Sequence, residues 1–138
     1  MTLTILIVMS IMCFLFSLFA PEIILILGGK DYFEAVWIVP PVAMSIVFNM
    51  LYSLIGNFAF YYEKTKFVMF GTLTAAVINI ILNAIFIPMF GFVAAGYTTL
   101  VCYILYSMLH YFFMLRICKA EGIQQPFNGK AIWGVALI

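Results

Sequence analysis

The residues best suited to chemistry in this chain are uncharged polar side chains set in long apolar segments. In the stretch NIILNAIFIPMFG, residues 79–91, Asn79 and Asn83 lie four positions apart among isoleucine, leucine, alanine and phenylalanine. Residues four apart share one face of a helix, so the two carboxamides form a ridge that continues to Thr72. Carboxamides donate and accept hydrogen bonds without carrying charge. Such a ridge can bind a neutral polar ligand or another helix.

Two further apolar segments carry a similar stripe of small and polar residues at helical spacing. In residues 36–60 the stripe consists of Ser45, Asn49, Tyr52, Ser53, Gly56 and Asn57. In residues 92–115 it consists of Ala95, Thr99, Cys102, Tyr106 and His110.

Lipid tails cannot satisfy these polar groups, so the stripes face other helices or a water-filled cavity. Two interpretations stay open. The stripes are packing seams, with interhelical hydrogen bonds of about 0.6 to 2 kcal/mol each, or they line a cavity for a polar cargo. The candidate cavity-lining residues are Asn49, Tyr52, Asn57, Thr72, Asn79, Asn83 and Tyr106.

No catalytic constellation accompanies the stripes. The chain has a single histidine, no carboxylate pair and no glycine-rich phosphate loop. Its cysteines, Cys13, Cys102 and Cys118, form neither a CxxC pair nor a zinc-ligand spacing, and we interpret them as small apolar side chains. We expect no enzyme, no catalytic residue, no cofactor and no metal site.

The overall composition of the chain is that of a membrane protein. Of the 138 residues, 67% are hydrophobic and 8% are charged, with a mean hydropathy of +1.24. Soluble domains carry about 25% charged residues. A net charge of +1 without a basic patch argues against nucleic acid as a partner. The sequence therefore predicts an all-α protein dissolved in lipid.

Four apolar segments are each near the length of about 20 residues that spans a bilayer. We predict transmembrane helices at residues 3–20, 36–60, 67–87 and 92–115, the third ended by Pro88 and Gly91. The apolar residues 131–138 are too short to span and suggest a truncated fifth helix, hence a fragment of a longer protein. Residues 1–138 are expected to form a single transmembrane unit.

The basic residues predict the topology. Loops 28–35 and 88–91 share one side of the membrane and contain one basic residue, Lys30. Loops 61–66 and 116–130 share the other side and contain five. Short loops rich in lysine and arginine stay in the cytoplasm, so we expect the second side and the N-terminus to be cytoplasmic.

Three further residue types have plain interpretations. Pro40 and Pro41 are expected to begin the second helix, with a transport hinge as the alternative. We interpret Glu22 as an exposed carboxylate near a helix end. His110 is expected to be a hydrogen-bonded histidine close to the membrane interface.

Two stretches resemble one transporter family. Residues 19–35, FAPEIILILGGKDYFEA, and residues 78–99, INIILNAIFIPMFGFVAAGYTT, resemble segments of the lipid-linked oligosaccharide (Wzx-type) flippases. These belong to the multidrug/oligosaccharidyl-lipid/polysaccharide exporter superfamily. The second stretch follows the pattern N-x-x-x-N … I-P-x-x-G-x-x-G-A-A, matched by Asn79, Asn83, Ile87, Pro88 and Gly91. Ala94 replaces a usual glycine, and Ala95-Gly96 replaces Ala-Ala.

The resemblance implies a transporter of about twelve to fourteen helices in two six-helix bundles, of which this chain would be a C-terminal fragment. Its implied activity is flipping a polyprenyl-diphosphate-linked oligosaccharide across the cytoplasmic membrane of a prokaryote by alternating access, for surface polysaccharide export. Membrane lipids and the missing N-terminal helices would be its other partners. Candidate contacts to the diphosphate at the inner surface are Lys64, Lys66 and Arg116.

Two alternatives remain beside the flippase. A multidrug exporter of the same superfamily would want a buried carboxylate for a cationic drug, and the apolar segments contain none. A scaffold subunit without transport activity would use the stripes only as packing seams.

Overall fold

The computed structural model describes residues 2–124 and residue 134, and these residues are mostly helical, with no strand among them. The elements are α1 (Thr2–Leu18), α2 (Ala20–Gly28), the 3₁₀ helix η1 (Lys30–Trp37), α3 (Val39–Tyr61), α4 (Thr65–Phe90) and α5 (Val93–Glu121). Helices α3, α4 and α5 are each long and apolar enough to cross a membrane. The chain is thus a multi-pass all-α membrane protein. The expected truncated helix 131–138 lies outside the described residues except for residue 134.

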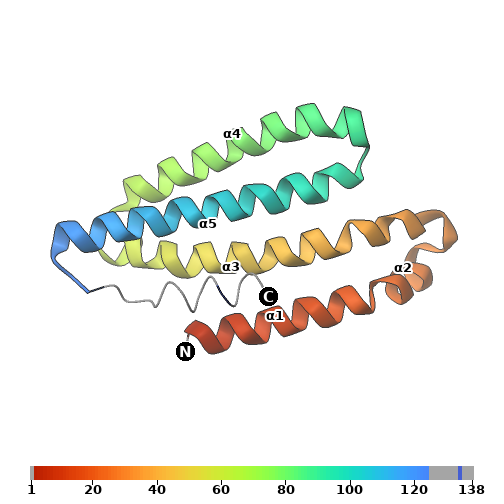
Figure 1. Ribbon diagram of the computed structural model, residues 1–138, viewed down its shortest axis with the longest axis horizontal. Helices are drawn as coiled ribbons and strands as arrows, with labels where there is room; N and C mark the ends of the chain where they lie inside the picture. Colours follow the sequence, from red (N-terminus) through yellow and green to blue (C-terminus); the bar gives the residue numbers. More distant parts are fainter. Residues whose placement is uncertain (1, 125–133, 135–138) are drawn as a thin grey trace.

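The long helices lie side by side in the order α1, α3, α5, α4 (Figure 1). Helix α5 therefore lies between α3 and α4, although α4 follows α3 directly in the chain. The connection from α3 to α4 lies at the same end as the C-terminus of α5, and α2 and η1 lie at the opposite end together with the turn from α4 to α5 (Figure 1). The predicted loop 28–35 is mostly the 3₁₀ helix η1, and 116–121 belong to α5, but the described parts of the two predicted groups of loops still lie at opposite ends of the molecule.

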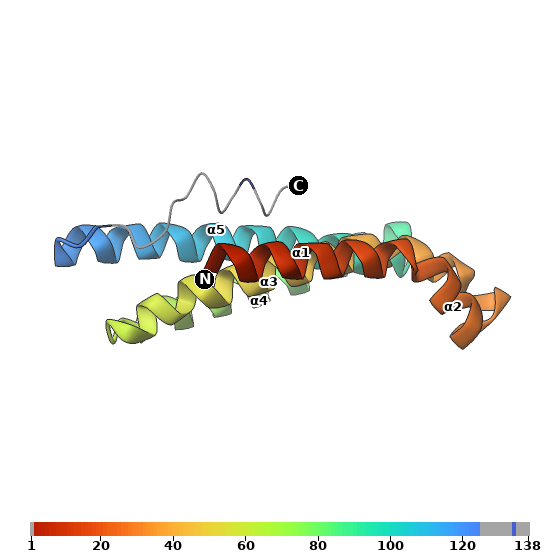
Figure 2. The same ribbon diagram turned by 90° about the horizontal axis from the view of Figure 1, so that it is seen from below.

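A bend separates α1 from α2. The two helices meet at 55° and together are apolar enough to count as one broken span. Pro21 lies in the first turn of α2, where its missing N–H removes a hydrogen bond to the preceding turn. Figure 2 shows α2 turning away from the layer of long helices. The expected straight helix 3–20 therefore ends two residues early, at Leu18.

Proline has different effects at the ends of the next two helices. Pro40 and Pro41 lie in the first turn of α3, which confirms that they begin this helix. Pro88 was expected to end the third helix, but α4 continues through it to Phe90. The helix ends at Gly91, whose N–H donates to the carbonyl of Ile87 at 2.8 Å.

Helix α5 is longer than predicted. The segment 92–115 becomes Val93–Glu121, so that Arg116 is helical and does not lie in a loop. Gly122 ends the helix in the left-handed conformation with φ 66°. At about 1.5 Å per residue, its 29 residues make a helix longer than the hydrocarbon core of about 30 Å.

The core lies between α1, α3 and α5. Its buried residues are Leu6, Phe48, Leu51, Ile55, Met114 and Cys118. Helix α4 contributes a single buried residue, Gly71, and otherwise packs along one side of α5. Most remaining large apolar side chains are exposed on the described surface, as a lipid solvent requires.

Gly91 supplies a first test of the fold. Its backbone has φ 72° and ψ −169°, a region that essentially only glycine adopts. A Cβ there would meet no atom within 4 Å, so the cost of Gly91→Ala is conformational. We expect the free energy of unfolding in detergent micelles to fall by about 1 to 3 kcal/mol. Ala84→Ser, at an exposed position of α4, should change it by less than about 0.5 kcal/mol, and equal stabilities of the two variants would contradict the backbone assignment.

Candidate functional site

A polar hollow of about 300 Å³ lies between α4 and α5. Its lining residues are Thr72, Ala75, Ala76, Asn79, Thr99, Cys102, Tyr103 and Tyr106. Four of them carry hydroxyls and one carries a carboxamide, and none is charged. The small side chains of Ala75 and Ala76 on α4 leave room for this hollow. We call it the polar hollow.

Thr72 and Tyr106 join the two helices at one end of the polar hollow. Their side-chain oxygens form a short hydrogen bond, and Thr72 also donates to the carbonyl of Val68 at 2.9 Å. The ring of Tyr52 on α3 lies on that of Tyr106, with centroids 4.2 Å apart. This contact connects the polar hollow to α3.

Asn79 and Asn83 form a hydrogen-bonded ladder at the other end. The Oγ1 of Thr98 donates to Oδ1 of Asn83 at 2.5 Å, and Nδ2 of Asn83 donates to Oδ1 of Asn79 at 2.9 Å. Asn83 is thus occupied in a seam between α4 and α5. Asn79 takes part in the ladder and also lines the polar hollow.

The seven predicted cavity-lining residues differ in where they lie relative to the polar hollow. Thr72, Asn79 and Tyr106 line the polar hollow, and Tyr52 and Asn83 contact its lining residues. Asn49 and Asn57 do neither. Asn49 is half-buried on α3, and Asn57 is exposed beside the buried Gly56.

The remaining lining residues, Ala75, Ala76, Thr99, Cys102 and Tyr103, were absent from the predicted set, and two of them, Thr99 and Tyr103, are polar. Thr99 lay on the stripe of its segment, and its hydroxyl donates to the carbonyl of Ala95 at 2.7 Å. Tyr103 follows four residues later on the same side of α5. Extending the stripe by this spacing would have found it.

A second hollow, of about 450 Å³, lies at the end of the molecule where α4 begins and α5 ends. Its lining residues are Lys64, Phe67, Arg116, Ile117, Lys119 and Ala120. We call it the basic hollow. Of the three predicted phosphate contacts, Lys64 and Arg116 line it and Lys66 does not. Lys119 was not predicted to take part.

Two contacts orient the cations of the basic hollow. Nζ of Lys64 lies 3.2 Å from a carboxylate oxygen of Glu121, with both side chains well exposed. The guanidinium of Arg116 lies 4.8 Å from the ring centre of Phe112. The basic hollow thus combines three cations with the apolar side chains of Phe67, Ile117 and Ala120 in one lining.

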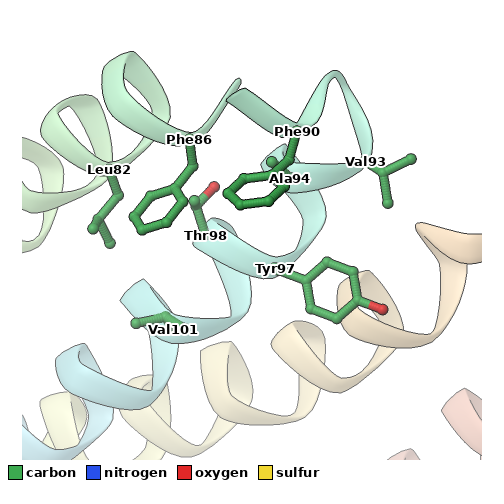
Figure 3. Close-up of a pocket in the computed structure, with 8 residues that line it drawn as sticks. All are labelled: Leu82, Phe86, Phe90, Val93, Ala94, Tyr97, Thr98 and Val101. Carbon is green, nitrogen blue, oxygen red and sulfur yellow. The ribbon is translucent and has the colours of Figure 1, made fainter. Parts of the chain in front are cut away.

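A third hollow, of about 590 Å³, lies near the turn between α4 and α5. Figure 3 shows the rings of Phe86 and Phe90 on α4 near Thr98 of α5, with Leu82 and Val101 at one end. Its lining is almost wholly apolar. It offers a neutral polar cargo little beyond hydrocarbon, so it is not the candidate site.

His110 differs from the sequence expectation of a hydrogen-bonded interfacial residue. It is 3% exposed and lies inside the helix layer, and among the described residues its Nε2 has no hydrogen-bond partner. The ring contacts Tyr52 and Tyr106.

Comparison of the chain with protein-family models, with curated proteins and with solved structures found no match. Within residues 2–124 and residue 134, no group of three histidine, cysteine, aspartate or glutamate side chains is placed to hold a metal ion. The chemistry of the two polar sites therefore carries the functional conclusion.

Proposed function

We propose that this chain is part of a membrane transporter that flips lipid-linked oligosaccharide repeat units across the cytoplasmic membrane of a prokaryote by alternating access. The observation that carries the proposal is the polar hollow, whose lining includes four hydroxyls and a carboxamide but no charged group, although several of these groups also bond to one another or to the backbone. Hydroxyls and carboxamides both donate and accept hydrogen bonds. Such groups are better suited to bind a neutral sugar, which is rich in hydroxyl groups, than to bind an ion or a cationic drug.

The basic hollow extends the proposal to the lipid carrier. Lys64 and Arg116 would meet the diphosphate of a polyprenyl-linked sugar, with Lys119 beside them. In this proposal the basic end faces the cytoplasm. In this proposal α1 and α2 also form one broken span, so that the described residues cross the membrane four times. The N-terminal helices of the transporter would supply the opposite wall of the path.

The two alternatives differ in their support. A multidrug exporter is disfavoured because no carboxylate lines the polar hollow. A scaffold subunit without transport activity gains support from the ladder of Thr98, Asn83 and Asn79, which uses amides to join helices. The hydroxyls of Thr99 and Tyr103 join no second helix among the described residues, and this favours the transporter.

An export assay tests the proposal. The double variant Asn79→Leu, Thr99→Val removes a carboxamide and a hydroxyl from the polar hollow while keeping apolar volume. Loss of about 1.4 kcal/mol of transition-state binding lowers a rate about tenfold. We therefore expect surface polysaccharide export by cells that depend on the full transporter to fall at least about tenfold.

Thr74→Val is the matched control, since Thr74 is exposed on α4 and does not line the polar hollow. Its export should equal that of the parent protein. Normal export by the double variant, with both proteins present at equal amounts in the membrane, would remove the polar hollow from the transport path.

A further inference from the structure

His110 lies where α3, α4 and α5 meet. Its ring centre is 4.5 Å from that of Tyr106 on α5, 5.3 Å from that of Tyr52 on α3 and 6.4 Å from that of Phe113. At 3% exposure, it is the only ionisable side chain between residues 67 and 115 other than tyrosine and cysteine. A polar ring therefore fills the junction on which the position of α4 depends.

Glycine brings α4 against this ring. A Cβ built on Gly71 would lie 2.7 Å from Nε2 of His110, closer than real Cβ atoms approach, so the imidazole edge occupies the space of a side chain at position 71. On α3, a Cβ built on Gly56 would lie 3.9 Å from Nδ1, an ordinary contact. The junction is therefore tight on the α4 side and relaxed on the α3 side.

Among the described residues, Nε2 of His110 has no hydrogen-bond partner that would stabilise an additional proton on the ring. The described titratable groups that face it are the phenols of Tyr52 on α3 and Tyr106 on α5, and α4 approaches it with Gly71. The hydroxyl of Thr72 is engaged with Tyr106 and with the carbonyl of Val68. Lys66 and Arg116 are the nearest charged residues along α4 and α5, and both lie more than one turn away toward the basic end.

We infer that Nε2 of His110 is a reversible proton-binding site whose occupation releases α4 from α5. A neutral imidazole has one donor and one acceptor nitrogen, whereas the protonated ring has two donors and a positive charge. A charge buried without a partner is strongly disfavoured. Movement of α4 away from α5 relieves this cost because it lets water reach Nε2. The same movement separates Thr72 from Tyr106 and opens the polar hollow.

The direction of the pH response follows because the described side chains that face His110 are uncharged. While the ring is neutral α4 stays packed, and acidification that protonates the ring releases the helix. The ligand of this site is the proton and the moving element is α4, whatever the polar hollow binds.

Spin labels on α4 and α5 test the inference in the full chain, reconstituted in nanodiscs with its three cysteines replaced. Labels at Met69 and Phe112, both exposed on the described surface, report the separation of the helices by pulsed electron resonance. The chain contains one histidine, so its imidazole NMR signal reports protonation of His110 alone. We expect the label distance to lengthen on acidification with the same midpoint as the histidine signal.

His110→Gln keeps an uncharged polar side chain and should abolish the pH response. A matched glycine pair provides a test that does not alter the histidine. Gly71→Ala should lengthen the distance already at pH 8, whereas Gly56→Ala should leave both the distance and its pH response as in the parent chain. A constant distance while the histidine protonates would overturn the inference. So would a pH response that persists in His110→Gln.

Discussion

Replacing Phe48 with alanine is expected to lower the free energy of unfolding within the membrane by about 2 to 3 kcal/mol. Phe48 is fully buried in the core between α1, α3 and α5. In lipid, the unfolded helices also lie in an apolar solvent, so the hydrophobic transfer term is absent and packing contacts carry the association. The cost then comes from the cavity, at about 24 cal/mol per Å³ over the roughly 100 Å³ that the substitution removes.

Unfolding in mixed micelles, followed by circular dichroism, measures this effect. The matched control is Phe14→Ala on α1, because Phe14 is 63% exposed and its removal leaves a gap that lipid fills. Its free energy of unfolding should change by less than about 0.5 kcal/mol. An equal loss in the two variants would mean that Phe48 is not held in a packed core and that the order α1, α3, α5 is wrong.

The four long helices could be predicted from the sequence because each apolar segment is long and bounded by polar or turn-forming residues, whereas α2 and η1 were not predicted. Pro21 shows what such a prediction from the sequence leaves out. A proline near the end of an apolar segment predicts a break, but the direction and the 55° size of the bend depend on what the next segment packs against. Pro88 shows another limit, since a proline in the last turn costs one hydrogen bond and is tolerated there.

The candidate site was predictable only in part. Periodicity groups Asn49 and Asn57 on one face of a helix, but it does not say which neighbour that face meets. Helix α5 packs beside the stripe, so Gly56 is buried and Asn57 is exposed.

Contacts between helices far apart in the sequence were not predictable at all. The approach of Gly71 to His110 joins α4 to α5 in a way that no pattern within either helix indicates. The same holds for the ring of Tyr52 on that of Tyr106.

Water access to the polar hollow separates a transport path from a packing seam more sharply than any stability change. Cysteine at Asn79 or Thr99, in a chain without other cysteines, would place a thiol in the lining of the polar hollow. A thiol reacts as its thiolate, which forms in contact with water and not in hydrocarbon. Cysteine at Ile81, which is 51% exposed on α4 outside the hollow, would instead face lipid.

The most direct measurement is labelling of these three cysteine variants, in native membranes, by a charged thiol reagent that does not cross the bilayer. The transporter account predicts that the thiols at positions 79 and 99 are labelled and that the thiol at position 81 is not, although all three are labelled after denaturation. Absence of labelling at both positions 79 and 99, with the reagent supplied on either side of the membrane, would contradict it and identify the stripe as a dry seam between α4 and α5.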